Sequence, residues 1–314
     1  MSESEYVIVA DSLVKQFPNK LAVNGISLKV KKGEVFGILG PNGAGKSTFL
    51  RMLTTLIPIT SGKATIFEKD VEKNSTEVRK LIGLTGQFAT IDETLTAMEN
   101  LMVFSELNGL SRKQSKKRAL DLLNQFSLIE AKDRPIKEFS GGMRRRLDLA
   151  VSLITSPPII FLDEPTTGLD PVTRGEMWDV IRNLIQSGST VVLTTQYLEE
   201  ADQLADRIAV INHGEIVAEG TPEKLKSLIG DTYFEITAAN AKDSARAQNI
   251  VTDMTGMEVR SLPERAAFAV KMSDTTEMIS VLESLRKQNI DVKEFTVRKP
   301  TLDEVFIELT KGGR

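Results

Sequence analysis

Residues 40–47 read Gly40-Pro41-Asn42-Gly43-Ala44-Gly45-Lys46-Ser47 and fit the pattern G-x-x-x-x-G-K-S/T. The apolar run at 34–39 before them is typical of a strand, and residues 46–57 after them have the pattern of a helix that Pro58 ends. A glycine-rich loop between a strand and a helix places backbone N–H groups around a phosphate. The sequence therefore predicts a phosphate-binding loop within an α/β fold.

The residue types of this loop each have a physical reason. Glycines allow the backbone to curl around a phosphate group, and the helix N-terminus adds positive potential. Lys46 supplies a point charge, so we expect it to contribute to catalysis as well as binding, and the Ser47 hydroxyl can ligate Mg²⁺. The predicted nucleotide-binding residues of the loop are Gly40, Asn42, Gly43, Ala44, Gly45, Lys46, Ser47 and Thr48.

Charge and composition exclude several classes of function. The chain has 314 residues, with 40 Lys and Arg against 43 Asp and Glu, so its net charge is −3. No overall positive field exists to hold a polyanion, which disfavours nucleic acid as the main partner. The absence of cysteine excludes disulfides, thiolate chemistry and cysteine zinc sites. The single histidine, His213, excludes a two-histidine metal site.

The N-terminal residues MSESEYVIVA carry acidic side chains where a secretory signal would be positively charged. We therefore expect a cytoplasmic protein. The most apolar region, 147–162, is interrupted by serine, threonine and two prolines, and it is shorter than the roughly 18 apolar residues of a membrane helix. Any membrane role is expected to depend on a partner.

Periodicity from residue 96 onward indicates two domains. Residues 96–156 are mostly helical in pattern, and short β-rich runs at 159–162 and 190–194 flank a helix at 176–186, which predicts a parallel sheet. After residue 233 the order is strand, helix, strand, strand, helix, strand, which is the ferredoxin-like arrangement. Thr301-Leu302-Asp303-Glu304 is a capping box that starts a last helix. We expect one domain at 1–230 that contains the phosphate-binding loop, with a helical subdomain at about 88–156, and an accessory α+β domain at 231–314.

Asp163 and Glu164 follow the apolar run 159–162. Neighbouring side chains on a strand point in opposite directions, so we expect the two carboxylates to have different roles. Asp163 would hold Mg²⁺, directly or through water, and Glu164 would polarise the water that attacks the γ-phosphate.

Three further segments carry a family resemblance. Phe139-Ser140-Gly141-Gly142-Met143 lies between the two motifs, with Gln87 before it and Thr167-Gly168-Leu169-Asp170 after it. Together they resemble the ATP-binding subunit of an ABC transporter, which implies a P-loop ABC ATPase core with a mixed sheet, ATP and Mg²⁺. The resemblance also implies a homodimer, with ATP held by the loop of one copy and by residues of the other, namely Ser140, Gly141, Gly142 and Asp170. Met143 replaces the usual glutamine.

Two side chains take roles from this resemblance. Phe17 stands where the family has an aromatic residue that stacks on adenine, and a buried core phenylalanine is the alternative. Gln87 resembles the glutamine that contacts Mg²⁺ and links the nucleotide to the helical subdomain. The expected metal ligands are therefore Ser47, Gln87 and Asp163.

One position departs from the family pattern. The family has a histidine after the strand at 190–194, where this chain has Gln196. An amide can donate a hydrogen bond to phosphate but cannot take up a proton near neutral pH. His213 lies in an expected hairpin turn and cannot replace it. We expect Gln196 to assist catalysis while Glu164 acts as the base.

The sequences at 139–150, 194–206 and 298–306 together resemble one branch of the family, the daunorubicin-resistance type of bacterial drug-efflux ATPase. This resemblance implies an ATPase that energises a separate integral membrane permease of the ABC-2 class for export of a drug-like or amphipathic compound. Such a subunit lies on the cytoplasmic face of the membrane through its permease. The alternative is a nucleotide-driven sensor or regulatory switch without transport.

Two basic clusters remain, one at 112–118 and one at Arg144, Arg145 and Arg146. We predict that both form solvated helix faces. Contact with lipid headgroups beneath a membrane partner is the alternative.

Overall fold

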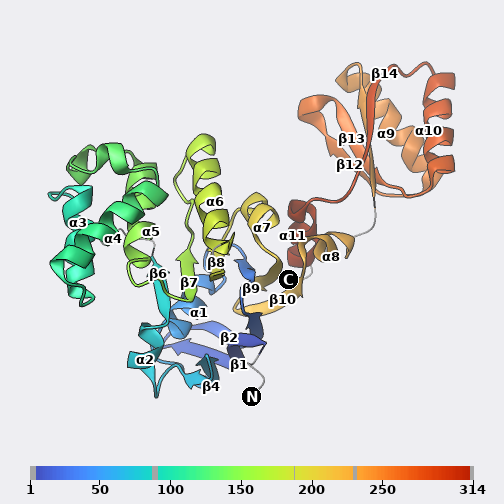
Figure 1. The fold of residues 1–314 in the computed structure, drawn as a ribbon. Helices are drawn as coiled ribbons and strands as arrows, with labels where there is room; N and C mark the ends of the chain where they lie inside the picture. Colours follow the sequence, from blue (N-terminus) through green and yellow to red (C-terminus); the bar gives the residue numbers. More distant parts are fainter. Residues whose placement is uncertain (1–4, 87–90, 187, 229–231, 312–314) are drawn as a thin grey trace. The chain divides into compact units, whose positions relative to one another are not determined.

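The computed structural model describes residues 5–86, 91–186, 188–228 and 232–311. The chain forms two compact units, Met1–Pro222 and Glu223–Arg314, whose elements are labelled in Figure 1. Residues 229–231, where we expected the domain boundary, lie outside the described residues.

A six-stranded sheet forms the centre of the first unit, with strand order β10-β9-β3-β8-β7-β6. The strands from β9 to β6 are parallel, which confirms the prediction for the runs at 159–162 and 190–194, and β10 is antiparallel to β9. Every residue of β3, β7 and β8 is buried, which is typical of a sheet covered on both faces. The strands are β3 (Val35–Leu39), β6 (Ile82–Thr85), β7 (Ile159–Asp163), β8 (Thr190–Thr195), β9 (Arg207–Asn212) and β10 (Glu215–Gly220).

An antiparallel sheet of order β2-β1-β4-β5 completes the core. Its strands are β1 (Tyr6–Phe17), β2 (Lys20–Lys31), β4 (Ser61–Ile66) and β5 (Lys69–Asp70), followed by α2 (Ser75–Arg79). Helix α1 (Lys46–Leu53) buries Phe49 and Leu50 in a cluster to which both sheets contribute. This helix is shorter than predicted because Thr55 adopts a left-handed φ of 64°, so the helix ends before Pro58 is reached.

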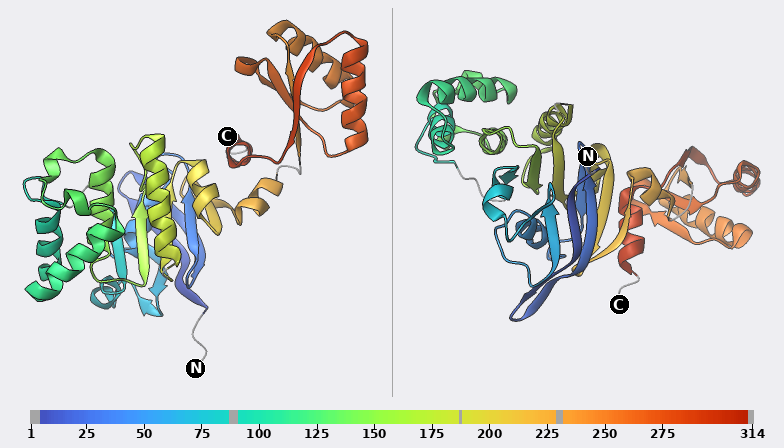
Figure 2. Two further views of the ribbon diagram at one scale, coloured as in Figure 1. Left: turned by 45° about the horizontal axis from the view of Figure 1, so that its top comes forward. Right: turned by 60° about the horizontal axis from the view of Figure 1, so that its bottom comes forward.

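Helices gather at one end of this unit, where α3, α4 and α5 lie beside one another in both views of Figure 2. The chain begins α3 and α4 with capping boxes, Thr96 with Glu99 and Ser111 with Gln114. The segments are α3 (Ala97–Leu107), α4 (Arg112–Gln125), two 3₁₀ turns (Ile129–Ala131 and Ile136–Glu138) and α5 (Gly141–Ser152); α6 (Pro171–Gln186) and α7 (Leu198–Leu204) follow β7 and β8. Within the described ranges, no helix has the length and apolar character needed to cross a bilayer.

The second unit begins within α8 (Pro222–Ser227). After α8, its strands and helices follow the predicted order. Its antiparallel sheet has the order β12-β13-β11-β14, which is the ferredoxin-like topology. Phe234, Phe268 and Val281 belong to its own core. Thr301 and Glu304 form the predicted capping box of the last helix. The elements are β11 (Tyr233–Ala238), α9 (Ala241–Thr255), β12 (Val259–Leu262), a 3₁₀ turn (Pro263–Arg265), β13 (Ala267–Lys271), α10 (Thr275–Lys287), β14 (Val292–Arg298) and α11 (Leu302–Lys311).

Candidate nucleotide site

The glycine loop after β3 is held between two neighbouring backbones. A Cβ atom at Gly40 would lie 2.3 Å from the Ile211 carbonyl oxygen, and one at Gly45 would lie 2.3 Å from the Ala22 carbonyl oxygen. Gly45 also has a φ of 107°, which side-chain-bearing residues rarely adopt. The Gly214 N–H donates to the Ala44 carbonyl at 2.9 Å. Glycine is therefore required at positions 40 and 45, because the loop packs directly against the backbone of Ile211 and Ala22.

Most of the expected loop residues line one small hollow, and Gly40 and Ala44 do not. Its volume is about 150 Å³, and its lining consists of Lys20, Ala22, Asn42, Gly43, Gly45, Lys46, Ser47, Thr48 and Glu164. The Lys46 ammonium is buried and donates to the Gly40 carbonyl at 2.8 Å, and it lies 3.3 Å from Glu164 Oε1. The expected phosphate-binding cation and the expected base are thus neighbours. A phosphate oxygen in the loop would compete with Glu164 for this ammonium.

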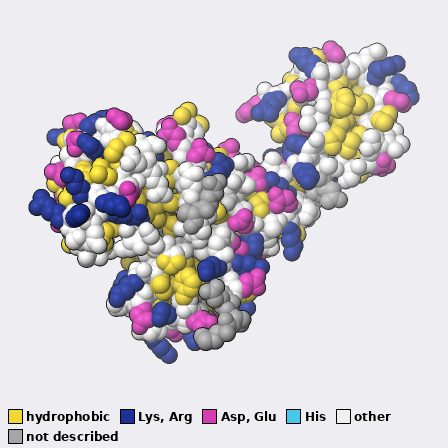
Figure 3. Space-filling view, viewed as in Figure 1, with side chains coloured by type: hydrophobic (Ala, Val, Ile, Leu, Met, Phe, Trp, Pro, Cys, Tyr) yellow, Lys and Arg dark blue, Asp and Glu magenta, His cyan; other side chains and the backbone are white. Residues whose placement is uncertain are grey.

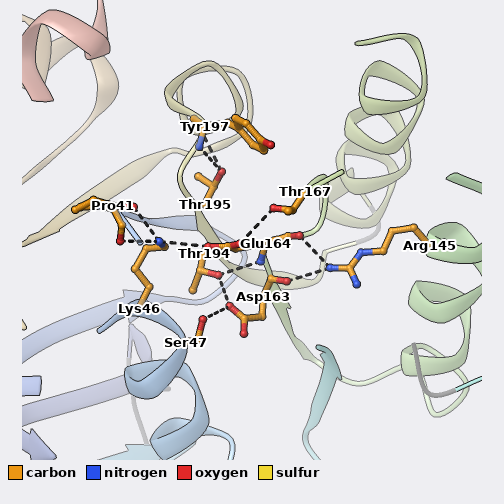
Figure 4. A network of polar contacts seen from close by, with 11 residues as sticks. Pro41, Lys46, Ser47, Arg145, Asp163, Glu164, Thr167, Thr194, Thr195 and Tyr197 are labelled. Carbon is orange, nitrogen blue, oxygen red and sulfur yellow. Dashed lines mark hydrogen bonds and ion pairs between the residues drawn. The ribbon is translucent and has the colours of Figure 1, made fainter. Parts of the chain in front are cut away.

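The side-chain carboxylates of Asp163 and Glu164, at the end of β7, have different partners, as Figure 4 shows, although both residues contact Thr194. Asp163 Oδ1 accepts hydrogen bonds from the hydroxyls of Ser47 at 2.9 Å and Thr194 at 2.6 Å. Glu164 has a left-handed φ of 50°, and its N–H donates to the Thr194 carbonyl at 3.1 Å. This strained backbone turns the Glu164 side chain toward Lys46 while Asp163 faces Ser47. The two carboxylates thus have different surroundings, and their different roles stay a prediction.

The oxygen atoms of Ser47 and Asp163 form a donor pair that suits Mg²⁺, which prefers hard oxygen ligands and keeps several waters. In the described ranges, histidine and carboxylate side chains do not gather in groups of three that could hold a metal on their own. Gln87, the third expected ligand, lies outside the described residues. The donor set therefore fits a metal that is shared with a phosphate rather than enclosed by protein.

The Ser140 segment begins helix α5. The Ser140 hydroxyl accepts a hydrogen bond from the Met143 N–H at 3.3 Å, and both Ser140 and Gly141 are exposed. Gly142 is buried. It packs so closely on α6 that a Cβ atom at this position would lie 2.0 Å from Cγ2 of Thr173. Asp170 is exposed at the start of α6, where hydrogen bonds from Thr173 and the Val172 N–H lower its pKa. Ser140, Gly141 and Asp170 are therefore accessible from solvent, and Gly142 is not.

A larger hollow of about 550 Å³ brings the Ser140 segment near the base. Its lining consists of Asn42, Gly141, Arg144, Arg145, Asp148, Glu164, Thr167, Gly168, Leu169 and Gln196. Gln196 therefore faces the same space as Glu164.

His213 is exposed in the hairpin turn between β9 and β10, as predicted from its flanking residues.

Phe17 ends β1 and is 40% exposed, so it is not a core phenylalanine. The ammonium of Lys15 lies 5.2 Å from the centre of its ring. An exposed ring beside a cation provides a flat face on which an aromatic base can stack.

Arg145 is the first residue that sequence reasoning missed. Its guanidinium donates to the backbone carbonyls of Gly86, Asp163, Glu164 and Pro165 at 2.6–3.0 Å. The side chains of Arg145 and Arg146 are only 14% and 16% exposed, so the prediction of a solvated face is wrong for both. The other basic cluster does face solvent for Arg112, Lys113, Lys116 and Lys117. Figure 3 shows Lys and Arg side chains gathered over this part of the helical region.

Glu200 on α7 is the second residue that was missed. It is fully buried, and its Oε1 accepts hydrogen bonds from the Thr166 hydroxyl at 2.8 Å and the Trp178 indole at 3.3 Å. Burial raises the pKa of the Glu200 carboxyl, and these hydrogen bonds oppose the rise. Glu200 thus ties the segment after Glu164 to the helix after Gln196.

The comparisons agree with this geometry. Residues 23–167 match the family model described as ABC transporter, and residues 220–310 match the model for the C-terminal domain of DrrA1-3-like ATP-binding proteins. The fold resembles CbiO1 from Clostridium perfringens, part of the ABC transporter complex CbiONQ, with a TM-score of 0.66 and 25% identity over 71% of this chain and 91% of that one. It also resembles the ATP-binding cassette MJ0796 bound to ADP and Pi as a dimer, with a TM-score of 0.62 and 28% identity over 68% of this chain and 98% of that one. Fold and site together define an ATP-binding cassette protein.

Relatives that are similar over nearly their whole length indicate the family within the ATP-binding cassette proteins. Daunorubicin/doxorubicin resistance ATP-binding protein DrrA of Streptomyces peucetius is 45% identical over 96% of this chain and 92% of its own length. Doxorubicin resistance ATP-binding protein DrrA of Mycobacterium tuberculosis (strain ATCC 25618 / H37Rv) is 39% identical over 99% and 95%. Linearmycin resistance ATP-binding protein LnrL of Bacillus subtilis (strain 168) is 35% identical over 97% and 98%. The chain belongs to the DrrA-like family of ABC transporter ATP-binding proteins.

Proposed function

We propose that this chain is an ATPase that powers a separate membrane permease for export of a drug-like or amphipathic compound. The observation that carries the proposal is the pair of contacts at the loop: Ser47 is hydrogen-bonded to Asp163, and the Lys46 ammonium lies at ion-pair distance from Glu164. The resistance names of the relatives support the cargo class, and the lack of a described membrane helix agrees with a separate permease.

The chemistry follows from the placement of these side chains. The loop amides and Lys46 bind the phosphates, and the Glu164 carboxylate accepts a proton from a water aligned with the γ-phosphorus. That water oxygen bonds to phosphorus as the bond to the bridging oxygen breaks, which yields ADP and phosphate. Gln196 donates a hydrogen bond to the γ-phosphate, and Phe17 stacks on adenine. When bound, Mg²⁺ held by Ser47, Asp163 and Gln87 would neutralise phosphate charge.

We infer that two copies form the closed state, with Ser140, Gly141, Gly142 and Asp170 of one copy facing the ATP of the other. The exposure of Ser140, Gly141 and Asp170 supports this assembly. The permease is proposed to be of the ABC-2 type, which would place the chain on the cytoplasmic face of the membrane. Nucleic acid has no role in this proposal, in keeping with the net charge of −3.

Steady-state release of phosphate from ATP tests the enzymatic part of the proposal. We expect turnover that requires Mg²⁺ and that falls by about a hundredfold or more in Glu164→Gln, because the base is lost. A chain that binds ATP without turnover would favour the sensor alternative. Co-purification with a polytopic membrane protein tests the transport part, and a chain that recovers no such protein from detergent-solubilised membranes of its source would contradict it.

A further inference from the structure

Arg145 makes contacts that the proposed chemistry does not use. Its Nε donates to the Pro165 carbonyl at 2.9 Å, and one terminal nitrogen donates to the carbonyls of Asp163 and Glu164, each at 3.0 Å. The other terminal nitrogen donates to the Gly86 carbonyl at 2.6 Å. One side chain from α5 therefore holds the backbone on both sides of the base, as Figure 4 shows for Asp163 and Glu164.

The guanidinium group is suited to this arrangement. Its planar fork presents five N–H donors in fixed directions, whereas an ammonium is a compact point charge. Burial lowers the pKa of Arg145, but an arginine side chain remains protonated at any physiological pH. The charge is thus permanent, and the carbonyl dipoles at the end of β7 stabilise it.

Helix α5 connects this fork to the Ser140 segment. Ser140 is the N-cap of α5 and Arg145 is in the second turn of the same helix, so both move with one rigid element. A displacement of the α5 N-terminus therefore changes the position of the carbonyls that flank Glu164. The packing of Gly142 against Thr173 leaves little freedom for α5 to slide on α6 instead.

We propose that Arg145 is a positioning residue that couples the Ser140 segment to Glu164. Contact of one ATP with Ser140 sets, through α5 and Arg145, the position of the Glu164 carboxylate that serves the other ATP of the dimer. The two sites thereby depend on each other. This inference rests on the proposed function, because it concerns the same ATPase reaction.

A double-mutant cycle on kcat in the full chain tests the coupling. We expect Arg145→Lys to lower kcat by about tenfold while KM changes little, because the base is misplaced and the loop is intact. Ser140→Ala lowers kcat on its own. Adding it to Arg145→Lys should cost less than about twofold more, since the route between the two residues is already broken.

Arg146→Lys is the matched control. Arg146 is a buried neighbour on the same helix, with its contacts to the Phe126 carbonyl and Glu176. In that background Ser140→Ala should lower kcat by its full factor. If the losses from Ser140→Ala and Arg145→Lys multiply instead, the two residues act independently and the inference is wrong.

Binding of a fluorescent ATP analogue separates positioning from general structure. Arg145→Lys and Arg145→Gln should bind it within about twofold of the unaltered chain. If both variants lose binding or do not fold, Arg145 supports the fold as a whole and the coupling proposal is overturned. If the unaltered chain itself has no ATPase activity, the proposed function fails rather than this inference.

Discussion

At the scale of single residues, the end of β8 has an amide where the family pattern has an imidazole. Gln196 shares a hollow with Glu164, and Glu164 lies 3.3 Å from Lys46. In the proposed mechanism, proton transfer depends on Glu164, while Gln196 contributes a neutral hydrogen-bond donor. These different roles predict how substitutions of Gln196 change ATP turnover.

Gln196→Ala should lower ATP turnover by about tenfold, which is the value of one hydrogen bond to a charged group. Gln196→His should be tolerated, because imidazole N–H also donates to phosphate. Steady-state phosphate release measures both variants. Unchanged turnover in Gln196→Ala would remove this residue from the mechanism.

The buried carboxyl of Glu200 predicts a dependence of stability on pH. Because its pKa is raised on folding, the folded chain binds more protons than the unfolded chain above pH 4.5, the ordinary value. The free energy of unfolding should then fall as pH rises from 4.5 to the raised pKa of the folded chain, by at most about 1.4 kcal/mol per pH unit. Glu200→Gln keeps an accepting oxygen for Thr166 and Trp178 but does not titrate.

Urea unfolding of both chains, followed by Trp178 fluorescence, measures this difference. The variant should gain stability relative to the unaltered chain as pH is raised above 4.5. Glu199→Gln, a change of the exposed neighbour, is the control and should show no such trend. Parallel pH profiles for all three chains would show that Glu200 does not titrate differently on folding.

At the scale of elements, the close approach of α5 and α6 explains why one of two adjacent glycines has room for a Cβ atom and the other does not. A Cβ atom at Gly142 meets Thr173 Cγ2 at 2.0 Å, whereas one at Gly141 meets no atom of the described chain within 4 Å. Thr173 cannot rotate freely, because its hydroxyl donates to Asp170 at 2.7 Å. Gly142 is therefore set by packing, and Gly141 is not.

Gly142→Ala should destabilise the chain by about 1–3 kcal/mol through overpacking. Thr173→Ser removes the clashing methyl group and keeps the hydroxyl, so it should restore much of the loss in the double variant. Gly141→Ala, in the same helix, should be neutral or slightly stabilising. Thermal unfolding midpoints measure all of these variants, and equal losses at the two glycines would contradict the packing explanation.

Much of the element order could be predicted because apolar runs and turn residues are local signals. The strand at 159–162, the glycine loop and the capping box of α11 all belong to this group. Arg145 and Glu200 could not be found in this way, because each lies in a charged run that is typical of a surface helix. Their partners are backbone carbonyls or residues distant in sequence, which only the folded chain brings together.

At the scale of the whole molecule, the proposed ATPase cycle requires a second copy of the chain. The small hollow at the loop has no lining residue from the Ser140 segment of the same chain, and family resemblance is what pairs the loop of one copy with that segment of the other. Closure of such a dimer is a population shift that ATP contacts drive, and hydrolysis reverses it. Slowing hydrolysis should therefore trap the closed state.

The most direct test of this assembly is the mass of Glu164→Gln in sedimentation with ATP and Mg²⁺. The account predicts a dimer with ATP and a monomer with ADP, because only the triphosphate reaches both the loop and the partner's Ser140 segment. Adding Ser140→Ala to Glu164→Gln should weaken the dimer while ATP binding persists. A Glu164→Gln chain that binds ATP and remains monomeric would contradict the account.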